Sequence, residues 1–138
     1  MRIADVTSRY FTIRRIKNTS ENRNHIHAKV RAAGYGFMGT NPSVWFDRMA
    51  IERFVRELRG LDQTREGSAT LETLSPGECE LTIHNADRCG HIQLVATIVR
   101  SIYEFEKYEY LRCRLSFEVN PTTFPQIIED LAEELLTG

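Results

Sequence analysis

The chain has 138 residues, of which 41% are hydrophobic and 27% charged, and its formal net charge is -1. This balance predicts a single globular domain over residues 1–138 and excludes a disordered tail, a fibrous repeat and a disulfide-stapled mini-protein. No apolar run approaches the roughly 18 residues of a membrane span. The three cysteines have no regular spacing, so we expect a cytoplasmic protein without a disulfide framework.

The charges are distributed unevenly along the chain. Residues 1–69 contain 13 Lys or Arg against 7 Asp or Glu, whereas residues 70–138 contain 5 against 12. One interpretation, the weaker one, is nucleic-acid binding by the basic N-terminal half, through Arg9, Arg14, Arg15, Lys17 and Arg23. The favoured interpretation is that basic strands pair with acidic strands across one sheet, because the chain as a whole is not basic.

The first half of the chain predicts two strands and a helix. Residues 9–17 are rich in aromatic and β-branched types, and residues 25–31 alternate apolar with polar side chains. After a glycine-rich stretch, we expect a helix to begin near Ser43 or Asp47 and to stop at Gly60.

The second half predicts four strands and a last helix. The strands span residues 69–74, 79–84, 91–102 and 110–119, and in the last of these the odd-numbered residues from Leu111 to Val119 should face inward. Asn120-Pro121 should start the helix. The order β-β-α-β-β-β-β-α predicts an α+β fold in which two amphipathic helices pack on an antiparallel sheet of about six strands.

The segment GYGFMG at residues 34–39 matches the spacing of a dinucleotide-binding loop. Such a loop must lead directly into a helix, and Pro42 prevents this. These glycines therefore predict a bend or bulge, and we expect no cofactor.

Two histidines, His25 and His27, share one face of a predicted strand, which is a spacing that zinc sites use. A metal- or cysteine-dependent enzyme would need further ligands from His84, Cys89 and His91 at a later hairpin. The two histidines also share their face with Lys29 and Arg31, which is typical of a solvated surface. We therefore keep the enzyme as an alternative and assign no catalytic residues.

Two clusters are candidates for binding a protein partner. In the first, aromatic and acidic side chains are interleaved: Tyr103, Glu104, Phe105, Glu106, Tyr108, Glu109 and Tyr110. The second is the acidic face of the last helix: Glu129, Asp130, Glu133 and Glu134. Exposed aromatics near charges are typical of protein interfaces, although some of them would equally well cap the core.

The order of several segments resembles a group of small bacterial proteins that includes the WapI-type immunity proteins. The segments are FVREL at 54–58, GSATLE at 67–72, SPGE at 75–78 with Leu81, GHIQL at 90–94 and LSFEVNP at 115–121. The resemblance covers roughly residues 50–136, and it rests on turn glycines and core leucines, which specify a fold rather than a site.

The resemblance implies a non-enzymatic protein that binds and silences a toxin, often a nuclease. The acidic clusters suit a basic toxin surface, because charge complementarity steers association. The uneven charge distribution also predicts weak homodimerisation, in which the basic strands of one copy meet the acidic helix of the other.

Overall fold

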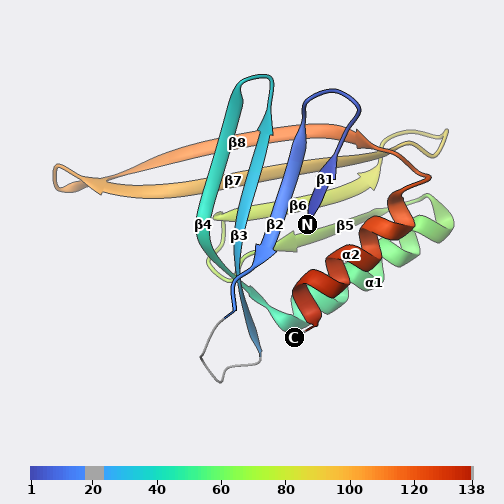
Figure 1. Ribbon diagram of the computed structural model, residues 1–138, viewed down its shortest axis with the longest axis horizontal. Helices are drawn as coiled ribbons and strands as arrows, with labels where there is room; N and C mark the ends of the chain where they lie inside the picture. The colour runs from blue at the N-terminus through green and yellow to red at the C-terminus, as the bar shows by residue number, and fades with distance from the viewer. Residues whose placement is uncertain (18–23, 138) are drawn as a thin grey trace.

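The same order of elements, four antiparallel strands followed by a helix, occurs twice along the chain (Figure 1). The computed structural model describes residues 1–17 and 24–137. The first half contains β1 (Arg2–Ala4), β2 (Tyr10–Arg15), β3 (His25–Gly34), β4 (Phe37–Asp47) and α1 (Arg48–Thr64). The second half contains β5 (Ser68–Glu72), β6 (Cys79–Asn85), β7 (Ile92–Glu104), β8 (Lys107–Val119) and α2 (Phe124–Leu136).

The strands form two separate sheets, so the prediction of one sheet with about six strands is wrong, whereas the α+β class and the antiparallel pairing are confirmed. The first sheet has the order β1-β2-β3-β4 and the second β5-β6-β7-β8. The basic and acidic halves of the chain therefore lie in different sheets, and the expected pairing of basic with acidic strands in one sheet is wrong.

The sequence did not reveal β4 because its glycine, its proline and the two glycines just before it are typical of a loop. Tyr35 and Gly36 both have positive φ angles, 53° and 84°, and form the two-residue turn that joins β3 to β4. Pro42 is tolerated because β4 is an edge strand and because a bulge interrupts the register between Ala28 and Val30. The predicted bend is thus a hairpin turn.

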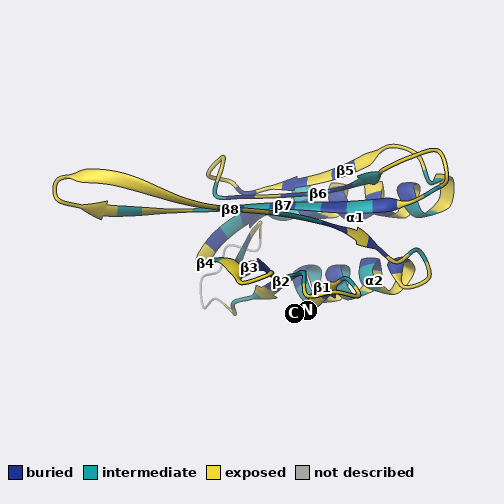
Figure 2. Cartoon of the chain, turned by 90° about the horizontal axis from the view of Figure 1, so that it is seen from above, coloured by how far each residue is buried: buried dark blue, intermediate teal, exposed yellow. Residues whose placement is uncertain are grey.

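The two sheets stack with their strands running across one another (Figures 1 and 2). The helices lie side by side, α1 against β5 of the second sheet and α2 beside β2 of the first. One core joins both sheets and both helices. Its largest fully buried side chains include Phe11, Phe46, Phe54, Phe117 and Phe124. The inner face of the second sheet is buried, whereas its outer face is polar and partly exposed.

The ends of the helices differ from the prediction in two places. Asp47 is the N-cap of α1, as one of the two alternatives predicted, and its carboxylate accepts a hydrogen bond of 3.2 Å from the amide of Met49. Gly60 does not end α1, because buried Leu61 extends the apolar face and the helix runs to Thr64. α2 begins at Phe124, because Asn120 instead accepts a hydrogen bond from the Thr122 amide in a preceding turn. Among the described residues, neither helix is long and apolar enough to span a membrane.

Candidate interaction surface

The β7–β8 hairpin extends beyond the other strands that pack against it. Both strands have 13 residues and pair along their full length, whereas β6 pairs with β7 only as far as Ile98. We call residues 100–111 the arm. It projects from the rest of the fold, and most of its surface is exposed (Figure 2).

The tip of the arm is a two-residue turn made by Phe105 and Glu106. Both have positive φ angles, 50° and 63°, which match the twist of a two-stranded ribbon but favour asparagine or glycine. The side chain of Phe105 at this turn is 88% exposed. A large apolar side chain thus occupies a strained and fully accessible position, a combination that is found where function outweighs stability.

Three tyrosines share the outer face of the arm. Tyr103 lies directly opposite Tyr108, with ring centroids 4.9 Å apart, and Tyr110 follows two residues further along β8. All three are more than 60% exposed. None of them caps the core, so the arm offers a preformed aromatic surface.

On the opposite face of the arm, the predicted inward orientation of Leu111 is wrong. Leu111 was expected to point into the core, but it is 55% exposed. The reason is that the first sheet covers β8 at Cys113, where Gly39 and Ala32 approach it, and Leu111 lies beyond that contact.

The charge of the arm changes along its length. The tip carries Glu104, Glu106 and Glu109, all exposed, and within the described residues Glu109 is the one of the three that forms an ion pair, with Lys107 at 3.7 Å. At the other end, Arg112 and Arg114 are exposed and form no ion pair with the described residues. The hairpin is therefore acidic at the tip of the arm and basic on β8 just past the arm, at Arg112 and Arg114.

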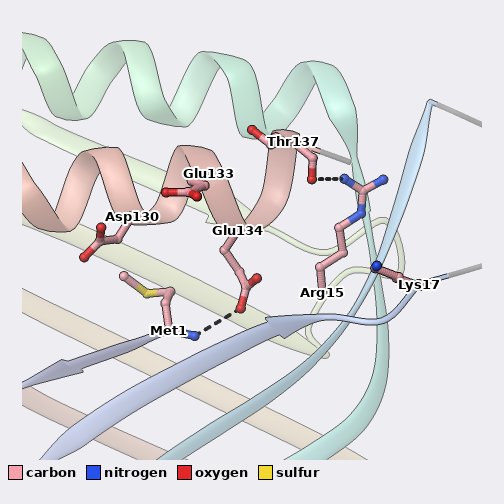
Figure 3. A pocket seen from close by; sticks show the side chains of 7 residues that line it. All are labelled: Met1, Arg15, Lys17, Asp130, Glu133, Glu134 and Thr137. Carbon is pink, nitrogen blue, oxygen red and sulfur yellow. Dashed lines mark hydrogen bonds and ion pairs between the residues drawn. The ribbon is translucent and has the colours of Figure 1, made fainter.

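The second predicted cluster, the acidic face of α2, is partly neutralised within the chain. Glu129 pairs with Arg59 of α1 at 3.2 Å, and Glu134 pairs with the amino group of Met1 at 3.1 Å. A pocket of about 670 Å³ lies beside Glu134, and there Arg15 donates a hydrogen bond of 3.3 Å to the carbonyl of Thr137 (Figure 3). Arg15 also donates one of 3.3 Å to the carbonyl of Leu135. Basic strand and acidic helix thus meet inside one copy of the chain.

The basic residues predicted to bind nucleic acid do not lie together: Arg15 and Lys17 line the pocket beside α2, whereas Arg14 lines another one with Lys29 and Arg31. Arg9 pairs with Asp5 at 2.9 Å and also donates a hydrogen bond to the carbonyl of Ser116. Burial raises the pKa of Asp5, but hydrogen bonds from Thr7 and Arg9 outweigh it, so the pKa lies below its ordinary value. Arg14 and Lys17 are exposed, and Arg23 lies outside the described residues.

A family model described as the immunity protein WapI-like family matches residues 3–137. The chain belongs to this family. The resemblance noted over residues 50–136 therefore extends across nearly the whole chain, the first sheet included. No curated protein and no solved structure gave a match.

The four histidines lie apart, on both sheets and in the loop before β7. His27 stacks on Trp45, with ring centroids 4.3 Å apart, and its Nε2 lies 2.7 Å from the hydroxyl of Ser43. His25 lies opposite Asp47 in the register of the first sheet. His84 lies on β6, and His91 and Cys89 lie in the loop that follows. In the described part of the chain, no three His, Cys, Asp or Glu side chains gather in a way that could hold a metal ion.

The loop between β6 and β7 contains one close acid–base pair. Nδ1 of His91 lies 2.5 Å from the carboxylate of Asp87, whose other oxygen accepts a hydrogen bond from the Cys89 amide. The hydrogen bond and charge of Asp87, with the charge of Glu118, raise the pKa of His91, and the bond to His91 lowers the pKa of Asp87. Both side chains are exposed, and the contact fixes the loop.

All three cysteines of the chain are free thiols. Burial raises the pKa of Cys79 to about 12 and also raises that of Cys113, so neither is a reactive thiolate. Cys89 is exposed in the loop after β6.

A second exposed apolar group, at the β3–β4 turn, was not predicted from the sequence. Tyr35, Phe37 and Met38 are each more than 60% exposed. The only hint was the positive φ that a glycine such as Gly36 permits, which suggested a turn but not which side chains it would expose.

Proposed function

We propose that this protein is a cytoplasmic immunity protein, that it neutralises a toxin by binding it directly, and that the arm is the main binding surface. Membership of the immunity family supports the general role. The observation that carries the assignment to the arm is the group of four exposed aromatic side chains on a ribbon outside the core.

The composition of the arm suits a protein partner. Tyrosine and arginine are the residue types most often responsible for binding energy, and the outer face presents Tyr103, Tyr108 and Tyr110 next to Arg112. Tyrosine loses little conformational entropy on binding and offers both a ring and a hydroxyl. Because the hairpin is already paired before binding, its backbone also loses little conformational entropy when a partner binds. Binding of this kind requires neither a cofactor nor a catalytic residue.

The acidic residues have a different role in this proposal. A toxin that acts on nucleic acid needs a basic surface to hold phosphates, and the acidic tip of the arm would attract that surface from a distance. The acids of α2 contribute less, because Glu129 and Glu134 already have partners in the same chain.

The experiment uses the genes next to the one that encodes this protein. The C-terminal domain of a large secreted protein encoded there is expressed in a bacterial host, alone and together with this protein. We expect the domain alone to stop growth and the co-expressed protein to restore it. A toxic domain against which the protein gives no protection would refute the assignment for that pair, and a purely metabolic gene neighbourhood would count against the immunity role.

A further inference from the structure

The four outer edges of the two sheets are not equally protected. β1 has only three residues and β5 only five, and β4 carries Pro42 and a bulge. β8 is a 13-residue edge strand with no proline and an uninterrupted register. Proteins usually shorten, kink or cover such an edge, because its free backbone groups pair readily with another strand.

The geometry of the tip determines which backbone groups of β8 are free. A two-residue turn makes its flanking residues, Glu104 and Lys107, a hydrogen-bonded pair. The odd-numbered residues of β8 therefore direct their N–H and C=O groups toward β7, and the even-numbered residues direct theirs outward. The hydrogen bond of 3.1 Å that Nη1 of Arg9 donates to the carbonyl of Ser116 agrees with this, and it closes the edge at that residue.

The open part of the edge therefore runs from Tyr108 to Arg114. In the described chain, Tyr108, Tyr110, Arg112 and Arg114 take part in no backbone hydrogen bond on this side. The segment is centred on Leu111. When two such edges pair symmetrically over the whole open segment, the two-fold axis passes through this residue.

We propose that two copies of the chain join their β8 edges in antiparallel register about a two-fold axis at Leu111. In this register Tyr108 lies opposite Arg114 of the second copy, and Tyr110 lies opposite Arg112 of the second copy. Symmetry repeats both pairs, so the interface contains four tyrosine–arginine neighbours on one face and Leu111 against its own equivalent on the other. An arginine beside a tyrosine ring is a favourable pair, and no two like charges face each other directly.

Two further features favour a second copy as the occupant. The acidic tip of each arm comes to lie near Arg112 and Arg114 of the other copy, so the change of charge along the hairpin is self-complementary. The β3–β4 hairpin crosses β8 at Cys113, and its turn extends beyond that strand (Figure 1). Its exposed Phe37, on the same face of β4 as Gly39, would then cover the inner face of the added strand.

Crosslinking of the purified protein tests the register. Leu111→Cys is made in a Cys89→Ser background, which removes the exposed native thiol. Directly opposed residues that are not hydrogen-bonded lie close enough for a disulfide, so mild oxidation should yield a covalent dimer. The control is Phe105→Cys in the same background, at the more accessible tip, which would be far from its counterpart. Equal crosslinking of the two variants, or none at position 111, would overturn the proposal.

Sedimentation across a concentration series tests the edge itself. Arg112→Pro removes an outward N–H while leaving the β7–β8 ladder intact, and each dimer loses two hydrogen bonds and two arginines. The dimer dissociation constant should rise roughly tenfold or more. A wild-type chain that stays monomeric at every concentration, or a dimer unaffected by this substitution, would contradict the proposal; if the variant unfolds, the crosslinking pair decides. Both tests use the chain alone, so their failure leaves the toxin-binding proposal untouched.

Discussion

Gly39 of β4 lies directly against Cys113 of β8, so that a β-carbon added to the glycine would fall 2.3 Å from the Cβ of the cysteine. This contact brings the two sheets together at the point where the arm leaves the body. Gly39→Ala should therefore separate the sheets locally and destabilise the protein by about 1–3 kcal/mol.

Gly60→Ala is the matched control, since a β-carbon there meets nothing within 4 Å and the residue lies inside α1. It should raise the free energy of unfolding by up to about 1 kcal/mol, because alanine is the better helix former. Urea denaturation of both variants measures the two changes. Equal stability of Gly39→Ala and the wild type would show that the sheets are not in close contact at this point.

The sequence predicted those elements in which local pattern and tertiary burial agree. Alternation marked β3, because Ile26, Ala28 and Val30 are all buried, and helical spacing marked the apolar face of α1. β4 was missed because two of its residues are explained only by the folded structure. Gly39 lies where Cys113 approaches the strand, and Pro42 is tolerated because β4 is an edge strand. Nothing in the local sequence encodes either one.

The candidate surface was predicted only in part, again because tertiary contacts are not encoded locally. The interleaved aromatic and acidic residues identified the arm, but periodicity cannot show where the covering sheet ends. Leu111 continues the apolar alternation of Phe117 and Val119, yet only the latter two are buried. The separation of the sheets also determined which charges meet, so the pairing of α2 with the N-terminal strand could not be derived from composition.

The Asp87–His91 pair gives a pH prediction. The pKa of His91 is raised on folding, so its contribution to stability is present at low pH and is lost as the pH rises through the folded-state pKa. The pKa of Asp87 is lowered, so its contribution is lost as the pH falls through its own folded-state pKa. The pair should thus stabilise the loop only at weakly acidic pH, between these two values.

NMR titration of the His91 imidazole measures the first of these shifts. Asp87→Asn should lower the pKa of His91 toward its ordinary value of 6.5, whereas Asp130→Asn, on the distant helix α2, should leave it unchanged. An unaltered titration curve in Asp87→Asn would mean that the contact does not exist in solution.

The two acidic clusters should differ in their effect on the rate of toxin association. Replacing Glu104, Glu106 and Glu109 by Lys should slow association with a basic toxin domain at low salt, and the effect should fade as salt is raised. Reversing Glu129, Asp130, Glu133 and Glu134 should slow it less, because two of these acids have partners within the chain. Stopped-flow association at two salt concentrations, after a check of folding by circular dichroism, makes the comparison. A larger reduction of the association rate in the α2 variant than in the arm variant would show that the toxin binds at α2 instead.

The most direct test of the arm is the affinity of the toxin domain for three tyrosine variants, measured by calorimetry. Tyr103→Ala, Tyr108→Ala and Tyr110→Ala should each weaken binding by about 1–3 kcal/mol, which corresponds to roughly tenfold or more in Kd. Tyr35→Ala is the control, because Tyr35 is also 65% exposed, like Tyr108, but lies at the β3–β4 turn outside the arm. The account predicts a loss of affinity in the three arm variants and none in Tyr35→Ala. Unchanged affinity in all three arm variants, with their folding intact, would contradict it.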